Sequence, residues 1–363
     1  MAGLRAHAVR VIEGVGFSQR HGAAYASNHS YDLEPYFSFF LIRFGYMKWL
    51  VLLLWLVGCA SRPVAPPAAP PAVPTAAPTA PAPVALAEVP VAADATAPGP
   101  VAKRPPRLCL ALGGGAARGF AHIGVIQVLE ESGIKPHCVA GTSAGSLVAA
   151  LYASGLSGTE LAKVALRMDE SAITDWSFPG RGVIRGEALA RYVRQQTQGK
   201  LIEQLPMPLG IVATDLDSGQ GVLFRRGDLG QAVRASSAVP AVFQPVRIAN
   251  REYVDGGLVS PVPVRYAREM GAEMVVAVDI STQPEGQPTG DPFSLLLQTF
   301  SIMGKSINQF ELREADVVVR PALVGVSSAD FTARQRAIQA GRQAALSQVG
   351  AIRERVKALA QPL

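Results

Sequence analysis

From Arg107 to the C-terminus, short apolar segments alternate with segments that have helical spacing, and this alternation limits the possible folds more than any other feature. The first strand-like segments are 108–112 and 137–140, and they are followed in turn by the helix-like segments 120–131 and 143–154. An order of strand, helix, strand and helix predicts a parallel sheet covered by helices. We therefore predict an α/β fold.

The alternation continues over the rest of the chain, and we find no internal repeat. Further strands are predicted at 208–214, 222–225, 274–278 and 317–319, and another one ends at Val254. Further helices are predicted at 158–168, 187–196, 228–236, 262–270, 293–314 and 330–359. The turn residues at 217–221 predict a hairpin between the first two of these strands. Nothing requires a second domain, so residues 107–363 are predicted to form one.

The segment before this domain differs in composition. Residues 63–106 are almost wholly Pro, Ala, Val and Thr, a mixture that cannot bury enough apolar surface to fold, so we predict an extended tether. Residues 47–58 carry one basic residue and then a short apolar run, as secretory signal peptides do. The run Leu56-Val57-Gly58-Cys59 resembles a bacterial lipobox, in which the cysteine is lipidated and becomes the first mature residue. The alternative is a short membrane anchor or buried helix with an incidental cysteine.

The lipobox interpretation has consequences for the rest of the N-terminal part. Translation would start at Met47, and residues 1–46 would be a start-site artefact or an unstructured extension. Residues 59–106 would be the lipidated cysteine and its tether. By resemblance to bacterial lipoproteins, Ala60 after the cysteine, rather than aspartate, favours the outer membrane. We therefore expect a lipid-anchored protein that faces the periplasm.

The charge of the chain gives little support to nucleic-acid binding. The first 58 residues carry five Lys/Arg and three Asp/Glu, so the net charge falls from +6 to +4 without them, and no long basic run remains. The mild positive charge suits an anionic lipid surface, but solubility alone explains it. Cys109 and Cys138 each lie in an apolar strand-like segment, which favours buried thiols over a metal site. If the two strands were neighbours outside the cytoplasm, these cysteines would be able to form a disulfide.

The pentapeptide 141–145, GTSAG, stands between a predicted strand and a predicted helix. It fits the pattern GxSxG, in which a strand turns sharply into a helix and exposes a serine hydroxyl. Gly141 and Gly145 satisfy the need for small residues where the two backbones approach each other. The helix N-terminus at Ser143 would favour developing negative charge. The pattern is only five residues long, so by itself it does not exclude a structural turn whose serine is not a nucleophile.

A glycine-rich segment at 113–119 follows the first strand, and its backbone N–H groups would be able to face an anion. The dinucleotide pattern GxGxxG fails here, because its last glycine falls on Arg118 in one register and its second on Ala116 in the other. There is no P-loop Gly-Lys-Ser/Thr either. We favour an oxyanion hole over a phosphate site, since the serine turn occurs one strand–helix unit later.

A serine nucleophile needs a base, and histidines are scarce. After Cys59 only His122 and His137 remain, and neither lies in the late loop that supplies the histidine of α/β-hydrolases, so both are interpreted as structural. Carboxylates at strand ends are the alternative, and Asp255 stands out because two glycines follow it. Three competing aspartates have local explanations as turn or capping residues, namely Asp215, Asp217 and Asp279.

Taken together and in this order, the glycine-rich loop, GTSAG and Asp255-Gly256-Gly257 resemble the patatin-like phospholipase family over roughly 107–268. The resemblance implies a three-layer α/β/α fold with a mainly parallel central sheet, and a dyad of nucleophile Ser143 and base Asp255. It implies an oxyanion hole made by the amides of Gly114, Gly115 and Ala116, although many members have glycine where Ala116 stands. It implies no metal and no cofactor. The residues that flank these motifs are Gly113, Arg118, Gly119, Gly141, Gly145, Gly256 and Gly257.

The expected function is that of a serine acyl hydrolase, a phospholipase, lysophospholipase or esterase, which cleaves lipid acyl esters through an acyl-enzyme. A thioesterase or a protease would also be consistent with a serine hydrolase. The alternative from another class is a catalytically quiet lipoprotein that binds lipid or a partner through the same pocket. The expected partners are a lipid ester and, through Cys59, a membrane, with no nucleic acid. The oligomeric state and the identity of the lipid stay open.

Overall fold

The computed structural model describes residues 103–176, 181–287 and 289–362. The predicted signal peptide, the predicted lipidation site Cys59 and the predicted tether up to residue 102 lie outside these residues. The described part begins with β1 (Lys103–Arg104), which pairs with β12 (Gln361–Pro362) near the end of the chain.

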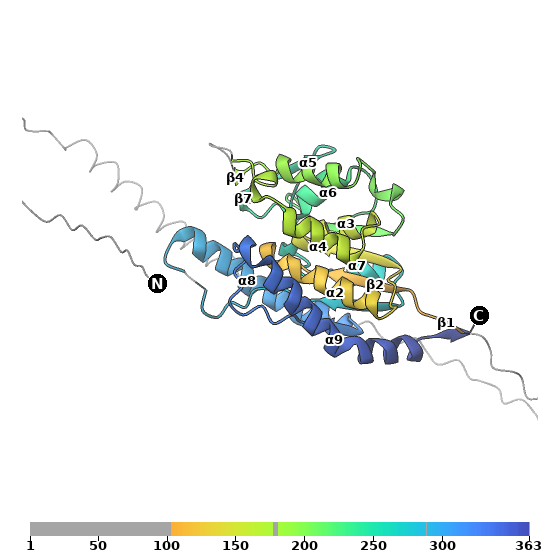
Figure 1. The fold of residues 1–363 in the computed structure, drawn as a ribbon. Coiled ribbons are helices and arrows are strands. Elements are labelled where there is room, and N and C mark those ends of the chain that lie inside the picture. Colours follow the sequence, from red (N-terminus) through yellow and green to blue (C-terminus); the bar gives the residue numbers. More distant parts are fainter. Residues whose placement is uncertain (1–102, 177–180, 288, 363) are drawn as a thin grey trace, which may run out of the picture. The chain divides into compact units, whose positions relative to one another are not determined.

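The centre of the fold is an eight-stranded sheet (Figure 1). Five of its strands are parallel, in the spatial order β11 (Val317–Val319), β10 (Met274–Val278), β2 (Leu108–Leu112), β3 (Cys138–Thr142) and β5 (Leu209–Asp215). The antiparallel strands beyond or beside β5 are β6 (Gly221–Phe224), β9 (Arg251–Asp255) and β8 (Val246–Ile248). The predicted hairpin of β5 and β6 is confirmed. A small separate pair joins β4 (Gly182–Ile184) to β7 (Ala241–Phe243).

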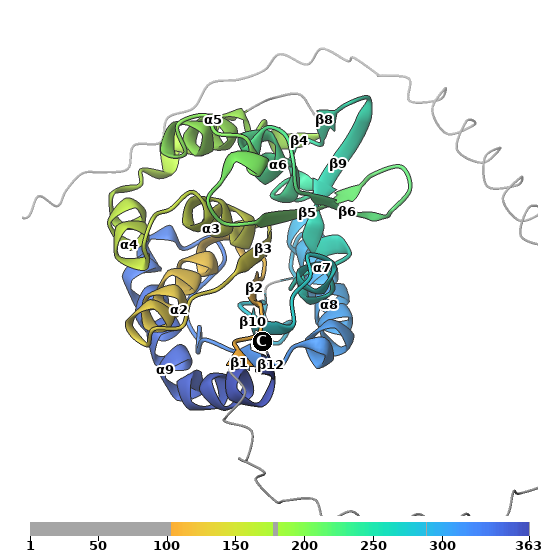
Figure 2. The ribbon, with the colours of Figure 1, turned by 90° about the vertical axis from the view of Figure 1, so that its right-hand side faces the viewer.

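Helices cover both faces of this sheet, as Figure 2 shows with the sheet seen edge-on. On one face lie α2 (Phe120–Glu131), α3 (Ala144–Ala153), α4 (Gly158–Arg167) and α9 (Arg334–Ala358). On the other lie α7 (Val264–Glu269) and α8 (Pro292–Glu311). The other α-helices of the described residues are α5 (Glu187–Gln196) and α6 (Leu229–Ser236). Short 3-10 helices also occur, namely η1 (Ala116–Gly119), η2 (Glu170–Ala172), η3 (Ile202–Gln204), η4 (Gly256–Leu258), η5 (Leu312–Glu314) and η6 (Phe331–Ala333).

The side chains of β2 alternate between two cores. Leu108, Leu110 and Leu112 are buried with residues of α2 and α9, whereas Cys109 and Ala111 are buried with residues of α7 and β10. A strand with both faces buried has no polar face, which explains why its sequence is continuously apolar. The three-layer α/β/α fold is therefore confirmed.

Capping residues mark where several helices begin. Ser157 and Glu160 form a capping box at the start of α4, and Asp228 accepts a hydrogen bond from the Gln231 N–H at the start of α6. Asp291 accepts hydrogen bonds from the second and third residues of α8. These local bonds satisfy N–H groups that a helix leaves without partners, so the sequence determines the starts of these helices.

Cys109 and Cys138 are joined in a disulfide. They lie opposite each other on the neighbouring strands β2 and β3, with their Cα atoms 4.6 Å apart. The sequence left buried thiols and a disulfide as alternatives, and the register of the two strands decides between them.

Candidate active site

Ser143 lies at the turn between β3 and α3, one residue after the strand ends. Its backbone has φ 53° and ψ −124°, a conformation that costs free energy for a residue with a side chain. Its N–H donates to Ser236 Oγ at 2.9 Å, and its carbonyl accepts from the Ser146 N–H at 2.8 Å and from Ser146 Oγ at 2.6 Å. The backbone of Ser143 is thus held from both sides in a strained turn, as such nucleophile turns are.

The two glycines of this turn are required by close approach. A Cβ on Gly141 would lie 2.5 Å from the Gly145 carbonyl oxygen, and one on Gly145 would overlap the carbonyl oxygen of Leu112 on the neighbouring strand. There is no room for a methyl group at either position. The physical reason inferred from the sequence for these glycines is therefore confirmed.

Asp255 comes near Ser143 at the end of a strand that runs antiparallel to β5. It is the last residue of β9, which runs antiparallel to β5, so that Asp255 pairs with Ala213. The residue before Ala213, Val212, pairs with Thr142 on the other side of β5. Asp255 and Ser143 are therefore separated by the single strand β5, and their side chains meet across it. The sequence did not reveal that the aspartate strand is antiparallel.

The Asp255 carboxyl group is almost wholly buried, with 6% of the residue exposed. Burial raises its pKa from 3.8 to about 6, against the opposing effects of a hydrogen bond from the Ser143 side chain and one from the Gly257 N–H. Oδ1 accepts the Gly257 N–H at 2.7 Å. Among the described residues Oδ2 has no partner in good hydrogen-bond geometry. One oxygen of a buried carboxylate is thus left to accept a proton.

The glycine-rich loop passes beside Ser143, since a Cβ on Gly114 would lie 3.1 Å from Ser143 Cβ. Of the three amides predicted for the oxyanion hole, that of Gly114 donates to the Pro261 carbonyl at 2.9 Å. The amides of Gly115 and Ala116 have no acceptor among the described residues, and neither has that of Ala144, at the first position of α3. Ala144 was missed, although the residue after a GxSxG serine commonly contributes such an N–H.

Ala116 has φ 47°, the left-handed region that disfavours a side chain. The family resemblance marked this position as one where many members have glycine, and the backbone conformation explains that preference. Alanine keeps its N–H, so the loop retains its path at the cost of local strain.

The residues that flank the motifs support the two loops. Arg118 donates to the carbonyls of Ile280 at 2.8 Å and Ser281 at 3.1 Å, which ties the glycine-rich loop to the segment after β10. A Cβ on Gly119 would lie 2.8 Å from Ala144 Cβ. At Gly256 a Cβ would overlap the Val212 carbonyl oxygen, so the turn after Asp255 packs directly on β5. These contacts hold the two loops in position.

The two histidines, both predicted to be structural, differ in burial. His122 is fully buried, its Nε2 bonds the Gly113 carbonyl at 2.8 Å, and burial lowers its pKa to about 4. His137 is exposed at the start of β3. The competing aspartates also have local partners: Asp215 pairs with Arg251 at 2.6 Å, and Asp279 accepts the Ser281 N–H at 3.1 Å.

Ser236 is a second residue that the sequence did not identify. It is fully buried at the end of α6, accepts the Ser143 N–H, and donates to the Val212 carbonyl at 2.6 Å. It therefore joins the serine turn to β5. No local pattern distinguishes it from other helix-terminal serines.

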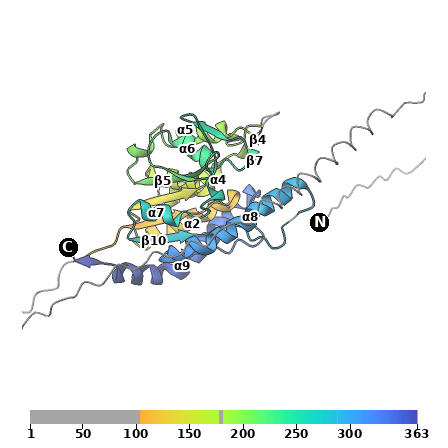
Figure 3. The same ribbon diagram turned by 180° about the vertical axis from the view of Figure 1, so that it is seen from behind.

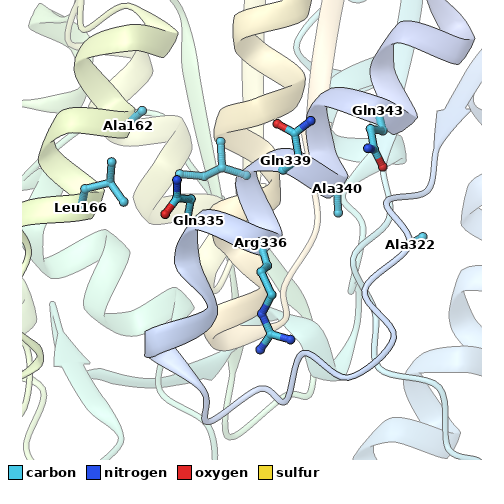
Figure 4. A pocket seen from close by; sticks show the side chains of 9 residues that line it. Ala162, Leu166, Ala322, Gln335, Arg336, Gln339, Ala340 and Gln343 are labelled. Atoms are coloured by element: carbon cyan, nitrogen blue, oxygen red, sulfur yellow. The ribbon is translucent and has the colours of Figure 1, made fainter.

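A surface cleft of about 740 Å³ lies elsewhere, between α4, α9 and the loop after β11. Figure 4 shows that glutamines and Arg336 of α9 line it. It contains neither Ser143 nor Asp255, so we assign it no part in the chemistry.

Residues 110–268 match the model of the patatin-like phospholipase family. An uncharacterized NTE family protein of Mycobacterium tuberculosis is 40% identical over 184 residues, which cover 50% of this chain and 51% of that protein. Patatin-like phospholipase domain-containing protein 6 of Homo sapiens is 34% identical over 186 residues, which cover 49% of this chain and 14% of that protein. The chain thus spans about half the length of the mycobacterial relative.

Among solved structures, VipD from Legionella pneumophila has a TM-score of 0.48 at 15% identity, over 69% of this chain and 68% of that one. The family match covers the serine turn, the glycine-rich loop and Asp255 without a break. On this match and on the identity to its curated relatives, residues 110–268 are similar to the patatin-like phospholipase family.

Proposed function

We propose that this chain is a serine acyl hydrolase of lipid esters, with Ser143 as nucleophile and Asp255 as base. The observation that carries the proposal is the meeting of a serine in a strained turn with a buried carboxylate whose Oδ2 has no well-aligned partner among the described residues. A carboxylate in water is a weak base for a hydroxyl, and burial raises its basicity.

The reaction follows from this arrangement. Asp255 takes the proton of Ser143 Oγ as that oxygen bonds to the ester carbonyl carbon, and the carbonyl oxygen becomes an oxyanion. The free N–H groups of Gly115, Ala116 and Ala144 are the donors that we assign to this oxyanion. When the intermediate collapses, Asp255 returns the proton to the leaving alcohol. A water molecule, deprotonated by Asp255, then attacks the acyl group and releases the fatty acid and Ser143.

A fluorophosphonate probe tests the proposal directly, because it labels serines that are activated as nucleophiles. Wild-type protein should be labelled, Ser143→Ala should not, and Ser154→Ala at the end of α3 should label like wild type. Absence of label on folded wild-type protein that still binds lipid would support the catalytically quiet alternative. Faster turnover of acyl thioesters than of phospholipids would favour a thioesterase.

The pKa of Asp255 predicts how activity depends on pH. The base must be ionised, so kcat/KM for a soluble ester should fall about tenfold per pH unit below pH 6, where the carboxyl becomes protonated. A pH–rate profile measures this limb, and a profile that is flat down to pH 4.5 would contradict the assignment.

The raised pKa of Asp255 supports catalysis but lowers the stability of the folded state above pH 6. Because the pKa of the folded state lies above the ordinary value of 3.8, the charged carboxylate destabilises the fold above pH 6, and this cost disappears as the pH falls toward 4. About two pKa units correspond to roughly 3 kcal/mol. Denaturant unfolding at pH 8 should therefore find Asp255→Asn more stable than wild type, with a smaller difference at pH 4.5.

We propose further that the mature chain is held to the outer membrane by a lipid on Cys59, with the catalytic domain in the periplasm. The lipobox-like run and the proline-rich segment that follows it support this location. Cys59→Ser should remain uncleaved and should not incorporate labelled fatty acid in cells. Mass spectrometry that finds residues 47–58 and an unmodified Cys59 in wild-type protein would show the anchor to be wrong.

A further inference from the structure

The outer side of α8 is unusual for a surface helix. Six large apolar side chains on it are each 36–64% exposed, and we call this set the α8 apolar face: Phe293, Leu295, Leu296, Ile302, Met303 and Phe310. Elsewhere the large exposed apolar residues occur singly on separate elements, such as Leu166 on α4 and Leu346 on α9. A contiguous set of this size marks an interaction surface rather than chance exposure.

No charged residue of α8 belongs to this face, and the Arg313 guanidinium that follows the helix lies 5.5 Å from the centre of the Phe310 ring. The two charged residues of α8 are Lys305, which pairs with Glu285, and the buried Glu311, which accepts a hydrogen bond from Ser260 Oγ at 2.7 Å. On the inner side of the helix, Asn308 Nδ2 donates to Ser281 Oγ at 2.8 Å and Gln298 Nε2 donates to the Pro284 carbonyl at 2.7 Å. The outer side of α8 is therefore more apolar than the solvent side of a surface helix usually is.

The position of α8 relates it to the candidate site. Gly304 packs on Pro261, with 3.5 Å from a Cβ at that glycine to Pro261 Cγ, and the Pro261 carbonyl binds the Gly114 N–H beside Ser143. A helix of this length spans about 30 Å, whereas a five-residue strand spans about 17 Å. Figures 1 and 3 show α8 projecting past the sheet on the side away from β1 and the C-terminus. Because β2 follows β1 in the chain, that side is where β2 ends, and Ser143 follows β3, which runs parallel to β2.

No helix among the described residues is both long and apolar enough to cross a membrane. A helix with one apolar face can lie in the plane of the interface with that face buried in the bilayer. The 44 residues from Cys59 to Lys103 would reach on the order of 100 Å when extended. That reach exceeds the roughly 45–50 Å width of a domain of this size, so an anchored chain is able to turn any face to the bilayer.

We propose that the α8 apolar face docks on a lipid bilayer and brings the candidate site at Ser143 to esters held in that bilayer. The purpose of this contact, access to lipid esters, rests on the proposed function. Binding of the α8 apolar face to a bilayer does not depend on hydrolysis. A second copy of the chain is the competing occupant of the same face.

The contact is tested in the full chain with Ser143→Ala, which removes hydrolysis of the vesicles. Thr299, which is exposed on the outer side of α8, is changed to cysteine and labelled with a fluorophore, and Ser347→Cys on α9 is the matched control. The parent without an added cysteine sets the labelling background. The probe is a vesicle of phosphatidylethanolamine and phosphatidylglycerol, with or without nitroxide on the acyl chains.

Nitroxide lipid should quench the α8 label at least about twofold and leave the α9 label almost unchanged, because an interfacial helix places its apolar face near the acyl chains. Equal quenching at the two positions would overturn the proposal. The proposal would also be overturned if the α8 label became shielded from solvent without vesicles and increasingly so at higher protein concentration, because that result indicates that a second copy of the chain covers the face. These readings do not depend on catalysis, so they are separate from failure of the proposed function.

A second pair of variants uses the active chain. Leu295→Lys with Ile302→Lys should lower hydrolysis of vesicle lipid about tenfold or more and leave hydrolysis of a soluble ester unchanged, because lysines resist burial in the interface. Leu346→Lys on α9 should change neither rate. Equal loss on both substrates, or no loss on vesicles, would contradict docking through α8.

Discussion

Ser143→Ala and Asp255→Asn should each lower kcat/KM for an acyl ester by on the order of 10⁴-fold, since the nucleophile and its base act in one step. The double variant should be scarcely worse than either single variant, because removing one member already prevents the step that needs the other. Steady-state kinetics on a soluble ester measure the three losses. Losses that multiply in the double variant would show that the two residues act independently.

The controls for this experiment lie close by in the chain. Asp217→Asn removes an exposed carboxylate from the β5–β6 turn, and Ser154→Ala removes a hydroxyl from the end of α3, so both should keep wild-type activity. Thermal unfolding of all variants establishes that the losses are catalytic. If Asp217→Asn were as inactive as Asp255→Asn, Asp255 would lose its assignment as base.

Gly145→Ala should destabilise the fold by at least about 3–5 kcal/mol, or prevent folding altogether. The added Cβ would overlap the Leu112 carbonyl oxygen and would lie 2.7 Å from that of Gly113. Both atoms belong to the backbone of β2 and its following loop, which cannot move without displacing the centre of the sheet. Denaturant unfolding, followed by circular dichroism, measures the change.

Gly350→Ala is the matched control for that variant. Gly350 also lies in a helix, α9, but a Cβ there would meet no atom within 4 Å. It should raise stability by up to about 1 kcal/mol, because alanine is the better helix former. Equal effects of the two substitutions would mean that the close approach of β2 and α3 is not what requires Gly145.

Local patterns accounted for most elements of the domain. The apolar segments at 108–112, 137–140 and 274–278 became parallel strands because both of their faces are covered, and a continuous apolar run has no other stable place in a sheet. GTSAG and the glycine-rich loop were recognisable because close backbone approach restricts which residues can stand there. The assignment of Ser143 and Asp255 rests on the same local features and stays a prediction until the variants are measured.

Other features depend on atoms that are far apart in the chain. The direction of β9, the hydrogen bond from Gly114 to Pro261, the bond between Ser236 and Ser143, and the pairing of Cys109 with Cys138 each join segments that are 29 to 147 residues apart. Sequence neighbours carry no information on such pairings. By itself the sequence determined which segments are strands and helices, where the sharp glycine turns fall and which motifs stand at strand ends, because these follow from local sterics and periodicity. Only the tertiary structure decided which amides remain free beside the serine, how a carboxylate from an antiparallel strand reaches it, and that α8 exposes large apolar side chains, because these depend on how distant segments pack together.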